Sequence, residues 1–297
     1  MNESEFPLVG VVVITWNQRD DTLECLTSIF RMAYPHLFVV LVDNASTDGT
    51  GAAVATQFPQ VECITNQANR GFAAAVNHGI ERALKRDAEY LLLLNNDTVV
   101  DSMALHHLMQ YATGDAVGML VPKIYYYAQP QMIWSVGAGL NWLTLETRGD
   151  IRDCMDDGRW KSVVERKHVT ACALLLPRRV VEKIGGLDER FFYYYDDADL
   201  SLRVHEAGYR TLLVPQAKVW HKVAQASGGV DTPYQRYWMG RSSVLYFRKH
   251  VHSWRWLIVG PYRLGSAIKT TIRLLAHRRF AAIKAYWHGL YDGLMVK

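Results

Sequence analysis

Short apolar runs that alternate with helical patterns constrain the fold of this chain more than any other feature of its sequence. Residues 8–15 are apolar, rich in β-branched side chains and too few for a buried helix, so they predict a buried strand. A helical pattern follows, with Leu23, Leu26 and Ile29 on one face. The alternation continues with expected strands at 37–42, 61–65 and 90–94 and expected helices at 50–58 and 71–86. This order predicts a mostly parallel sheet covered by helices on both faces.

Polar residues gather where three of these expected strands end. Thr15 and Asn17 close the first strand, Asp43 follows the second, and Asn96 and Asp97 follow the fourth. Ligands of an open parallel sheet bind outside the carboxyl ends of its strands, so we expect these side chains at one edge. No G-x-G-x-x-G motif follows the first strand, and no P-loop motif occurs in the chain. The pattern therefore predicts a nucleotide site that is neither a classical dinucleotide site nor a P-loop.

The composition is that of a globular chain. Its 297 residues, 49% of them hydrophobic, can bury the core of one large domain or of one domain plus an appendage. No apolar stretch approaches the roughly 18 residues of a membrane-spanning helix, and the N-terminus lacks the pattern of a signal peptide. The four cysteines form no C-x-x-C pair. We therefore expect a cytoplasmic protein without a transmembrane helix.

Charge is divided unevenly along the chain. Residues 234–297 hold 12 Lys and Arg against one acid, a net charge of +11, whereas residues 1–233 hold 21 against 28, a net charge of −7. The basic segment has helical spacing with interleaved Trp and Tyr, which predicts amphipathic helices. Such a segment suits peripheral binding to an anionic membrane surface, binding to nucleic acid, or packing on the domain as a helical cap. Composition leaves these alternatives open.

Six sequence blocks occur in a fixed order, namely VVVITWN, VDNASTDGT, NRGFAAAVN, LLLLNNDT, GGLDERFFYYYDDADLSLR and VWH. Together they resemble glycosyltransferase family 2 over residues 8–222, and the tail resembles the helical extension of its rhamnosyltransferase-like branch. The resemblance implies a GT-A fold, which is an α/β fold with a mostly parallel nucleotide-binding sheet flanked by helices, here with a C-terminal helical extension. It also implies a nucleoside-diphosphate-sugar donor, a divalent metal and inversion at the anomeric carbon.

The resemblance also divides the chain. Residues 1–233 are expected to form the glycosyltransferase domain, with the donor half at about 8–122 and the acceptor half at about 123–233. Residues 234–297 then form the basic amphipathic extension. Residues 125–168 lack clear periodicity and predict an irregular loop on the acceptor side, and residues 168–176 predict a further strand.

Asp97 is the first candidate metal ligand. It follows an apolar strand at the expected nucleotide edge, and a hard cation such as Mg²⁺ or Mn²⁺ prefers oxygen ligands that it shares with phosphates. His221 is similar to the downstream metal-ligating histidine of the family. Asn95 replaces the first acid of the family's usual acidic pair, which removes one charge from the site. The alternatives are a plain turn at Asp97 and a structural or surface role for His221.

Asp43 resembles the family's carboxylate that accepts the imide N–H of uracil or thymine, which implies a dTDP- or UDP-linked donor. Gly71 opens a helix whose N-terminus can face the phosphates, and Arg70 adds a positive charge or lies at the surface. The candidates for nucleotide contact are Thr15, Asn17, Asp43, Arg70, Gly71 and Asn96.

Asp197 matches the family's general base, because activating a sugar hydroxyl needs a carboxylate within hydrogen-bond reach. Tyr195, Asp196 and Asp199 are expected on the acceptor side of the site. The alternative is a helix at 200–207 with acidic residues at its start and an ion pair between Asp199 and Arg203. The aromatic run at 191–195 lines an acceptor site or packs in the core.

The expected function is transfer of a sugar, rhamnose by resemblance, from a nucleoside diphosphate to a hydroxyl of a glycan or lipid-linked acceptor. A sugar-nucleotide pyrophosphorylase is one alternative, but the sequence TWNQRDD after the first strand lacks its glycine-rich basic loop. A nucleic-acid binder that uses the basic tail is another, but it leaves Asp97 and Asp197 unexplained. We therefore expect no nucleic-acid partner.

Overall fold

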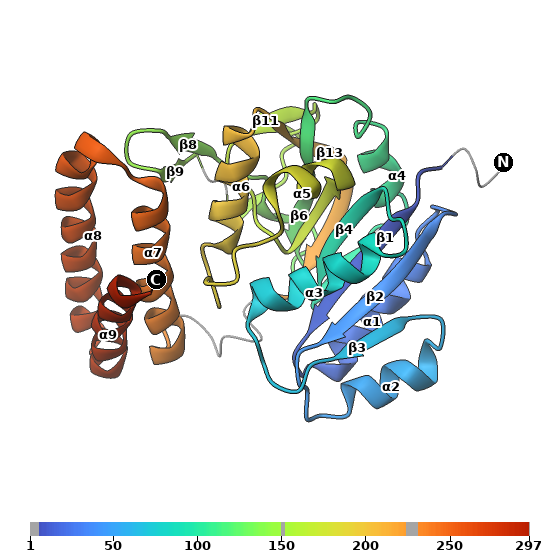
Figure 1. The fold of residues 1–297 in the computed structure, drawn as a ribbon, viewed down its shortest axis with the longest axis horizontal. Helices are drawn as coiled ribbons and strands as arrows, with labels where there is room; N and C mark the ends of the chain where they lie inside the picture. Colours follow the sequence, from blue (N-terminus) through green and yellow to red (C-terminus); the bar gives the residue numbers. More distant parts are fainter. Residues whose placement is uncertain (1–5, 150–151, 224–230, 297) are drawn as a thin grey trace.

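Residues 6–95 contain the parallel half of a large central sheet in the computed structural model, which describes residues 6–149, 152–223 and 231–296 (Figure 1). The strands are β1 (Val9–Thr15), β2 (Leu37–Asp43), β3 (Glu62–Thr65) and β4 (Tyr90–Asn95). They lie side by side in the order β3-β2-β1-β4, and each pair is parallel. The predicted strands of this region are therefore confirmed, because uninterrupted apolar runs are typical of strands buried on both faces.

An antiparallel strand interrupts the sheet beyond β4. This strand, β12 (Ala173–Pro177), pairs antiparallel with β4 and with β6 (Val117–Tyr126). The long strand β13 (Arg210–His221) runs parallel to β6 and antiparallel to β5 (Thr98–Val100). The strand expected at 168–176 is shorter than predicted, because residues 171 and 172 form a turn before the ladder with β4 begins.

Short strands occupy much of the segment that was expected to be an irregular loop. They are β7 (Met132–Ser135), β8 (Gly139–Asn141), β9 (Glu146–Arg148), β10 (Cys154–Met155) and β11 (Val164–Arg166). None exceeds four residues, so no alternation of apolar and polar side chains is long enough to indicate a strand. The pair β8 and β9 forms a separate hairpin that lies beside the C-terminal helices (Figure 1).

Helices cover both faces of the sheet. One face is covered by α1 (Arg19–Phe30), α2 (Thr50–Gln57) and α4 (Ala104–Met109), and the other by α3 (Phe72–Leu84), α5 (Arg178–Ile184) and α6 (Asp196–Glu206). Side chains of β1 alternate between the two cores: Val11 and Val13 face the first, and Val12 faces the second. Full burial of each such side chain contributes about 1.5–3 kcal/mol.

The basic segment forms three helices, α7 (Pro233–His250), α8 (Trp256–Ala276) and α9 (Phe280–Met295), with the 3₁₀ turn η2 (Ser253–Arg255) between the first two. Thr232 caps α7 by accepting the Gln235 N–H at 3.1 Å. A third core joins Tyr246 and Phe247 of α7 to Phe191 and Leu202 of the main domain. The extension is therefore attached through α7, while α8 lies farther out (Figure 1). Among the described residues, no helix is long and apolar enough to cross a membrane.

Gly79 lets α3 approach β1 closely, because a Cβ at this position would collide with Val12 Cγ1. We expect Gly79→Ala to overpack this contact and to lower the free energy of unfolding by about 1–3 kcal/mol. Gly265→Ala is the matched control, since it lies within α8 with no atom in reach of an added Cβ. Urea denaturation of both variants measures the effect. A Gly79→Ala protein as stable as the control would contradict the close approach.

Candidate active site

Asn96 and Asp97 lie in the turn after β4, at the carboxyl edge of the sheet. The Asn96 side-chain amide donates to the hydroxyls of Thr15 at 3.2 Å and Thr22 at 3.0 Å. Thr15 is fully buried, and its hydroxyl lies 2.8 Å from that of Thr22. Thr15 therefore holds the Asn96 side chain by a hydrogen bond. It is not among the residues that line the cavity beside Asn96 and Asp97.

The loops after β1 and β2 hold each other in place. The Asn17 N–H donates to Ser46 Oγ at 2.7 Å, and Asn17 Oδ1 accepts the Thr47 N–H at 2.9 Å. Asp43 is buried, and its Oδ1 accepts the Ser46 N–H at 2.8 Å. Non-glycine residues with positive φ cluster in these loops, namely Asn17, Gln18 and Ala45. Such backbone strain persists where surrounding contacts determine it, as they do at functional sites.

The close approach that Gly71 permits is to another part of the protein. Gly71 has a φ of 84°, and a Cβ there would lie 2.6 Å from Phe192 Cδ2. The Gly71 N–H donates to Asn69 Oδ1 at 2.9 Å, and the Phe72 N–H donates to the Phe192 carbonyl at 3.0 Å. Arg70 lies 3.8 Å from Glu189 in an exposed ion pair. Two N–H groups at the start of α3 are thus engaged within the chain, and phosphate contact by Arg70 or Gly71 stays a prediction.

Asp97 and His221 come together from distant parts of the sequence. His221 ends β13, which pairs with β5 directly after Asp97, and its Nε2 lies 3.0 Å from Asp97 Oδ1. Within the described chain, His221 Nδ1 and the nearby Asn95 Oδ1 are buried without a hydrogen-bond partner, and Asp97 Oδ1 has none besides this contact with His221.

Asp97 Oδ1 and His221 Nε2 are spaced as two neighbouring ligands of a divalent cation would be. Two neighbouring ligands of an octahedral ion with bonds of about 2.1 Å lie about 3 Å apart, which is the separation of the Asp97 and His221 atoms. The described residues contain no group of three His, Cys, Asp or Glu side chains that could hold a metal. A cation here would therefore share its coordination with groups from outside this set, as an ion between protein and diphosphate does.

Asp197 lies in the first turn of α6, because this helix begins at Asp196, earlier than the start at residue 200 that the alternative interpretation gave. Acidic side chains are favoured at a helix N-terminus, which explains the earlier start. Tyr194 and Tyr195 precede it with φ of 65° and 66°, and the Tyr195 ring packs 5.4 Å from that of Tyr246. Burial, together with the charges of Asp197 and Asp199, raises the pKa of Asp196 well above its usual value. The raised pKa of Asp196 thus follows from its burial and from the crowding of negative charge at this helix start.

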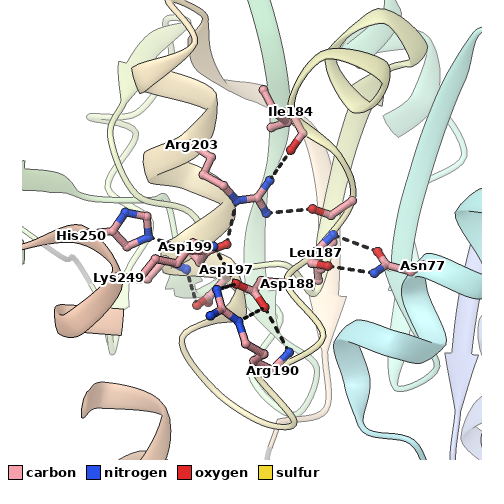
Figure 2. A network of polar contacts seen from close by, with 12 residues as sticks. Asn77, Ile184, Leu187, Asp188, Arg190, Asp197, Asp199, Arg203, Lys249 and His250 are labelled. Carbon is pink, nitrogen blue, oxygen red and sulfur yellow. Dashed lines mark hydrogen bonds and ion pairs between the residues drawn. The ribbon is translucent and has the colours of Figure 1, made fainter. Parts of the chain in front are cut away.

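Asp199 has a different environment from its two acidic neighbours (Figure 2). Its side chain is fully buried, with Oδ2 2.7 Å from Arg203 Nε and Oδ1 2.6 Å from Lys249 Nζ and 2.7 Å from His250 Nε2. Burial opposes ionisation of Asp199, but the hydrogen bond from His250 and the charges of Arg203 and Lys249 outweigh it and lower its pKa. The predicted Arg203 ion pair is present, and both carboxylate oxygens are engaged by the protein. Acceptor contact by Asp199 gains no support from this geometry.

The segment between α5 and α6 is fixed by the same network (Figure 2). Arg203 donates to the carbonyls of Ile184 at 3.0 Å and Gly186 at 2.8 Å, and Asn77 of α3 makes two hydrogen bonds to the backbone of Leu187. Lys249 of α7 also lies 2.7 Å from Asp188 Oδ2. The segment that leads to Asp197 is therefore tied to α3, α6 and α7.

Three adjoining cavities run along this edge of the protein. The rim cavity, of about 110 Å³, is lined by Trp16, Asn44, Asn95, Asn96 and Asp97 among others. The central cavity, of about 430 Å³, is lined by Asn95, Trp134, Asp196, Asp197 and His221 among others. The hairpin cavity, of about 210 Å³, is lined by Leu145, Glu146, His168, Asp197, Tyr246 and Phe247 among others. Asn95 lines both the rim and the central cavities and Asp197 lines both the central and the hairpin cavities, so the cavities of the candidate metal ligand and the candidate base adjoin each other.

Three further residues line the central cavity, and two of them, Trp134 and Arg152, carry no sequence signal that indicates a site. Trp134 lies edge-on to His221, with ring centroids 4.6 Å apart, and Arg152 lies over the Trp134 ring at 5.5 Å. Tyr193 lines both the rim and the central cavities. Trp134 and Arg152 fall in the segment without periodicity, where only the three-dimensional structure places them. Tyr193 falls in the aromatic run that was predicted to line the site or to pack in the core.

A family model described as "Glycosyl transferase family group 2" matches residues 90–290, which is more than half of the chain, and one described as "Glycosyl transferase family 2" matches residues 10–157. The chain therefore belongs to the family-2 group of glycosyltransferases. Its similar proteins include rhamnosyltransferases. It is 25% identical to the N-acetylglucosaminyl-diphospho-decaprenol L-rhamnosyltransferase of Mycobacterium tuberculosis, over 92% of this chain and 96% of the relative. It is 22% identical to the dTDP-rhamnosyl transferase RfbF of Shigella flexneri, over 82% and 80%.

Solved structures show the same fold. The mannosyltransferase PcManGT of Pyrobaculum calidifontis, in complex with GDP-Man and Mn²⁺, matches with a TM-score of 0.58 at 19% identity, over 99% of this chain and 86% of its own. GalNAc-T7 with UDP, GalNAc and Mn²⁺ matches with a TM-score of 0.59 at 13% identity, over 80% and 51%. The chain has a GT-A fold, which confirms the predicted fold class.

We expect Asp199→Asn to destabilise the protein by about 3 kcal/mol, because it leaves partly buried cations of α6 and α7 without their shared anion. Glu182→Gln is the control, since it removes one carboxylate from an exposed i, i+4 pair with Arg178 and should cost far less. Thermal and urea unfolding at neutral pH measure both effects. Equal stability of the two variants would show that the contacts of Asp199 contribute little to the free energy of unfolding.

The stability difference between wild type and Asp199→Asn should also depend on pH. Because the folded-state pKa of Asp199 is lowered, its stabilisation is present above the unfolded-state pKa of about 4 and is lost as the pH falls through the lower folded value. The stability difference between wild type and Asp199→Asn should therefore be constant near neutrality and shrink below about pH 4. A stability difference that grows on acidification would contradict an ionised Asp199 carboxylate in the folded protein.

Proposed function

We propose that this protein is an inverting glycosyltransferase in which Asp197 is the general base and Asp97 and His221 hold a divalent cation. One observation carries the proposal: Asp197 and His221 line the same central cavity, and His221 contacts Asp97, which lines the adjoining rim cavity. Family-2 membership supports sugar transfer. The pyrophosphorylase and nucleic-acid alternatives gain no comparable support.

The donor half, at about residues 8–122, would bind the nucleotide at the rim cavity. Asp43 is placed by its bond to Ser46 at the end of β2, and we propose that it reads a uracil or thymine base. Asn17 and Asn96 would either contact the nucleotide or hold the loops at this edge of the sheet in place through their hydrogen bonds to Thr47 and Thr22. A cation held by Asp97 and His221 would neutralise the charge that develops on the leaving diphosphate. Mn²⁺ in two structures of this fold supports that ion or Mg²⁺.

Asp197 would act on the acceptor from the opposite end of the central cavity. Its carboxylate takes the proton of the acceptor hydroxyl, whose oxygen forms a bond to the anomeric carbon as the bond to the diphosphate breaks. The electron pair of that bond leaves with the nucleoside diphosphate. Attack from the face opposite the leaving group inverts the configuration. Tyr195 and Asp196 directly precede the base and line the central cavity with it, so both are candidates for acceptor contact.

The acceptor half, at about residues 123–233, would take a glycan or a lipid-linked glycan. Two relatives support rhamnose as the sugar, since both are named as rhamnosyltransferases. One name includes a dTDP-rhamnosyl group, and the other includes a diphospho-decaprenol acceptor. The four cysteines are free, which supports a reducing, cytoplasmic setting. We propose polysaccharide or cell-wall assembly at the inner face of the membrane.

Asp197→Asn should lower the rate of transfer by about a hundredfold to ten-thousandfold, since it removes the base but keeps the shape of the side chain. Donor binding should persist, because Asp197 lies away from the rim cavity. Asp157→Asn, an exposed carboxylate outside all three cavities, is the control. Transfer by Asp197→Asn at the rate of the control would disprove the assigned base.

A thermal-shift panel of nucleoside-diphosphate sugars with and without Mn²⁺ should identify base, sugar and metal dependence together. We expect a UDP- or dTDP-linked sugar to stabilise the wild type more with Mn²⁺ than without it. Asp97→Ala and His221→Ala should lose that Mn²⁺-dependent increment, while Asp197→Asn keeps it. An increment that persists in both ligand variants would place the metal elsewhere.

A further inference from the structure

The outer side of α8 carries a row of exposed aliphatic side chains. Leu257, Leu264, Ile268, Ile272 and Leu275 are each 47–80% exposed. Their spacings of seven, four, four and three residues place them on one face of the helix. The side chains that α8 buries, Val259, Ala267 and Leu274, lie on a different face. In the described structure, this row has no apolar partner that covers it.

A second row on α9 continues this surface. Phe280, Trp287, Tyr291 and Leu294 are each 44–63% exposed and recur at spacings of seven, four and three residues. Trp287 Nε1 donates to Thr271 Oγ1 of α8 at 3.1 Å, so the two rows lie side by side. The helices stand at the end of the molecule away from β3 and α2 (Figure 1). We call the exposed side chains of both rows the outer face; contiguous apolar surface of this kind marks an interaction site.

The charges around the outer face indicate which kind of partner it binds. The outer face is bordered by exposed cations, Lys269, Arg278, Arg279 and Lys284, and α8 contains no acidic residue. The one acid of α9, Asp292, accepts the Tyr237 hydroxyl at 2.7 Å on the side of α7. A second copy of the chain would bring like charges together, whereas an anionic lipid surface complements them. Trp and Tyr among aliphatic side chains also suit the boundary between headgroups and acyl chains.

We propose that the outer face of α8 and α9 binds the surface of an anionic lipid bilayer and holds the hairpin cavity beside it. Arg263 of α8 lies 3.1 Å from Glu146 of β9, and Glu146 lines the hairpin cavity together with Asp197. The cavity is also lined by Leu145, Tyr246 and Phe247, so it offers apolar contact next to the base. The identity of a lipid-linked acceptor rests on the proposed function; binding of the helices to lipid does not.

Flotation of the full chain with phosphatidylcholine vesicles, with and without phosphatidylglycerol, tests the proposal. The wild type should float with the anionic vesicles, and the bound fraction should fall as salt is raised. The double variant Leu264→Glu and Ile272→Glu should bind at least about tenfold less. Met155→Glu is the control, since Met155 on β10 is 57% exposed and Leu264 is 58% exposed. Urea unfolding confirms that both proteins are folded.

Three results would overturn the proposal. One is flotation of the double variant as efficient as that of the wild type, and another is no flotation of the wild type at all. The third is a concentration-dependent dimer in sedimentation that the double variant abolishes while neither protein floats, which would assign the outer face to a second copy. Flotation needs no sugar transfer, so an inactive protein that floats contradicts only the proposed activity. A protein that transfers sugar to a water-soluble acceptor but does not float contradicts only the lipid contact.

Discussion

The buried carboxylate of Asp199 is the interaction on which the arrangement of this site depends. Removing a carboxylate from water costs several kcal/mol unless cations and hydrogen bonds compensate for it. Here Arg203 of α6 and Lys249 and His250 of α7 supply that compensation. Because Asp197 lies two residues before Asp199 on the same helix turn, the contacts that fix Asp199 also fix the start of the helix that carries Asp197. The helical extension is thus part of the support of the candidate base.

The parallel half of the fold follows from the sequence because its strands are continuous apolar runs and its helices have apolar faces. The same reasoning places Asp43, Asn96 and Asp97 at one edge, since the carboxyl ends of parallel strands meet there. The pairing of Asp97 with His221 is not visible in periodicity. It depends on the antiparallel contact between β5 and β13, more than a hundred residues apart. Only the family resemblance indicated it.

Other features could not be predicted for identifiable physical reasons. Asp196, Asp197 and Asp199 are the same residue type at one helix start, and only their three-dimensional surroundings separate them. Asp199 is enclosed by cations, Asp196 is buried beside like charges, and Asp197 faces two cavities. Gly71 resembles a nucleotide-facing glycine, but its missing Cβ makes room for Phe192. The strands β7 to β11 are too short to show a period.

The proposed mechanism is a single displacement in which Asp197 takes the acceptor proton and the sugar changes configuration once. The most direct test is the anomeric configuration of the product, measured by NMR with whichever donor the protein binds best. The account predicts a product of the configuration opposite to that of the donor. A product that retains the donor configuration would require a different mechanism and would contradict the role assigned to Asp197.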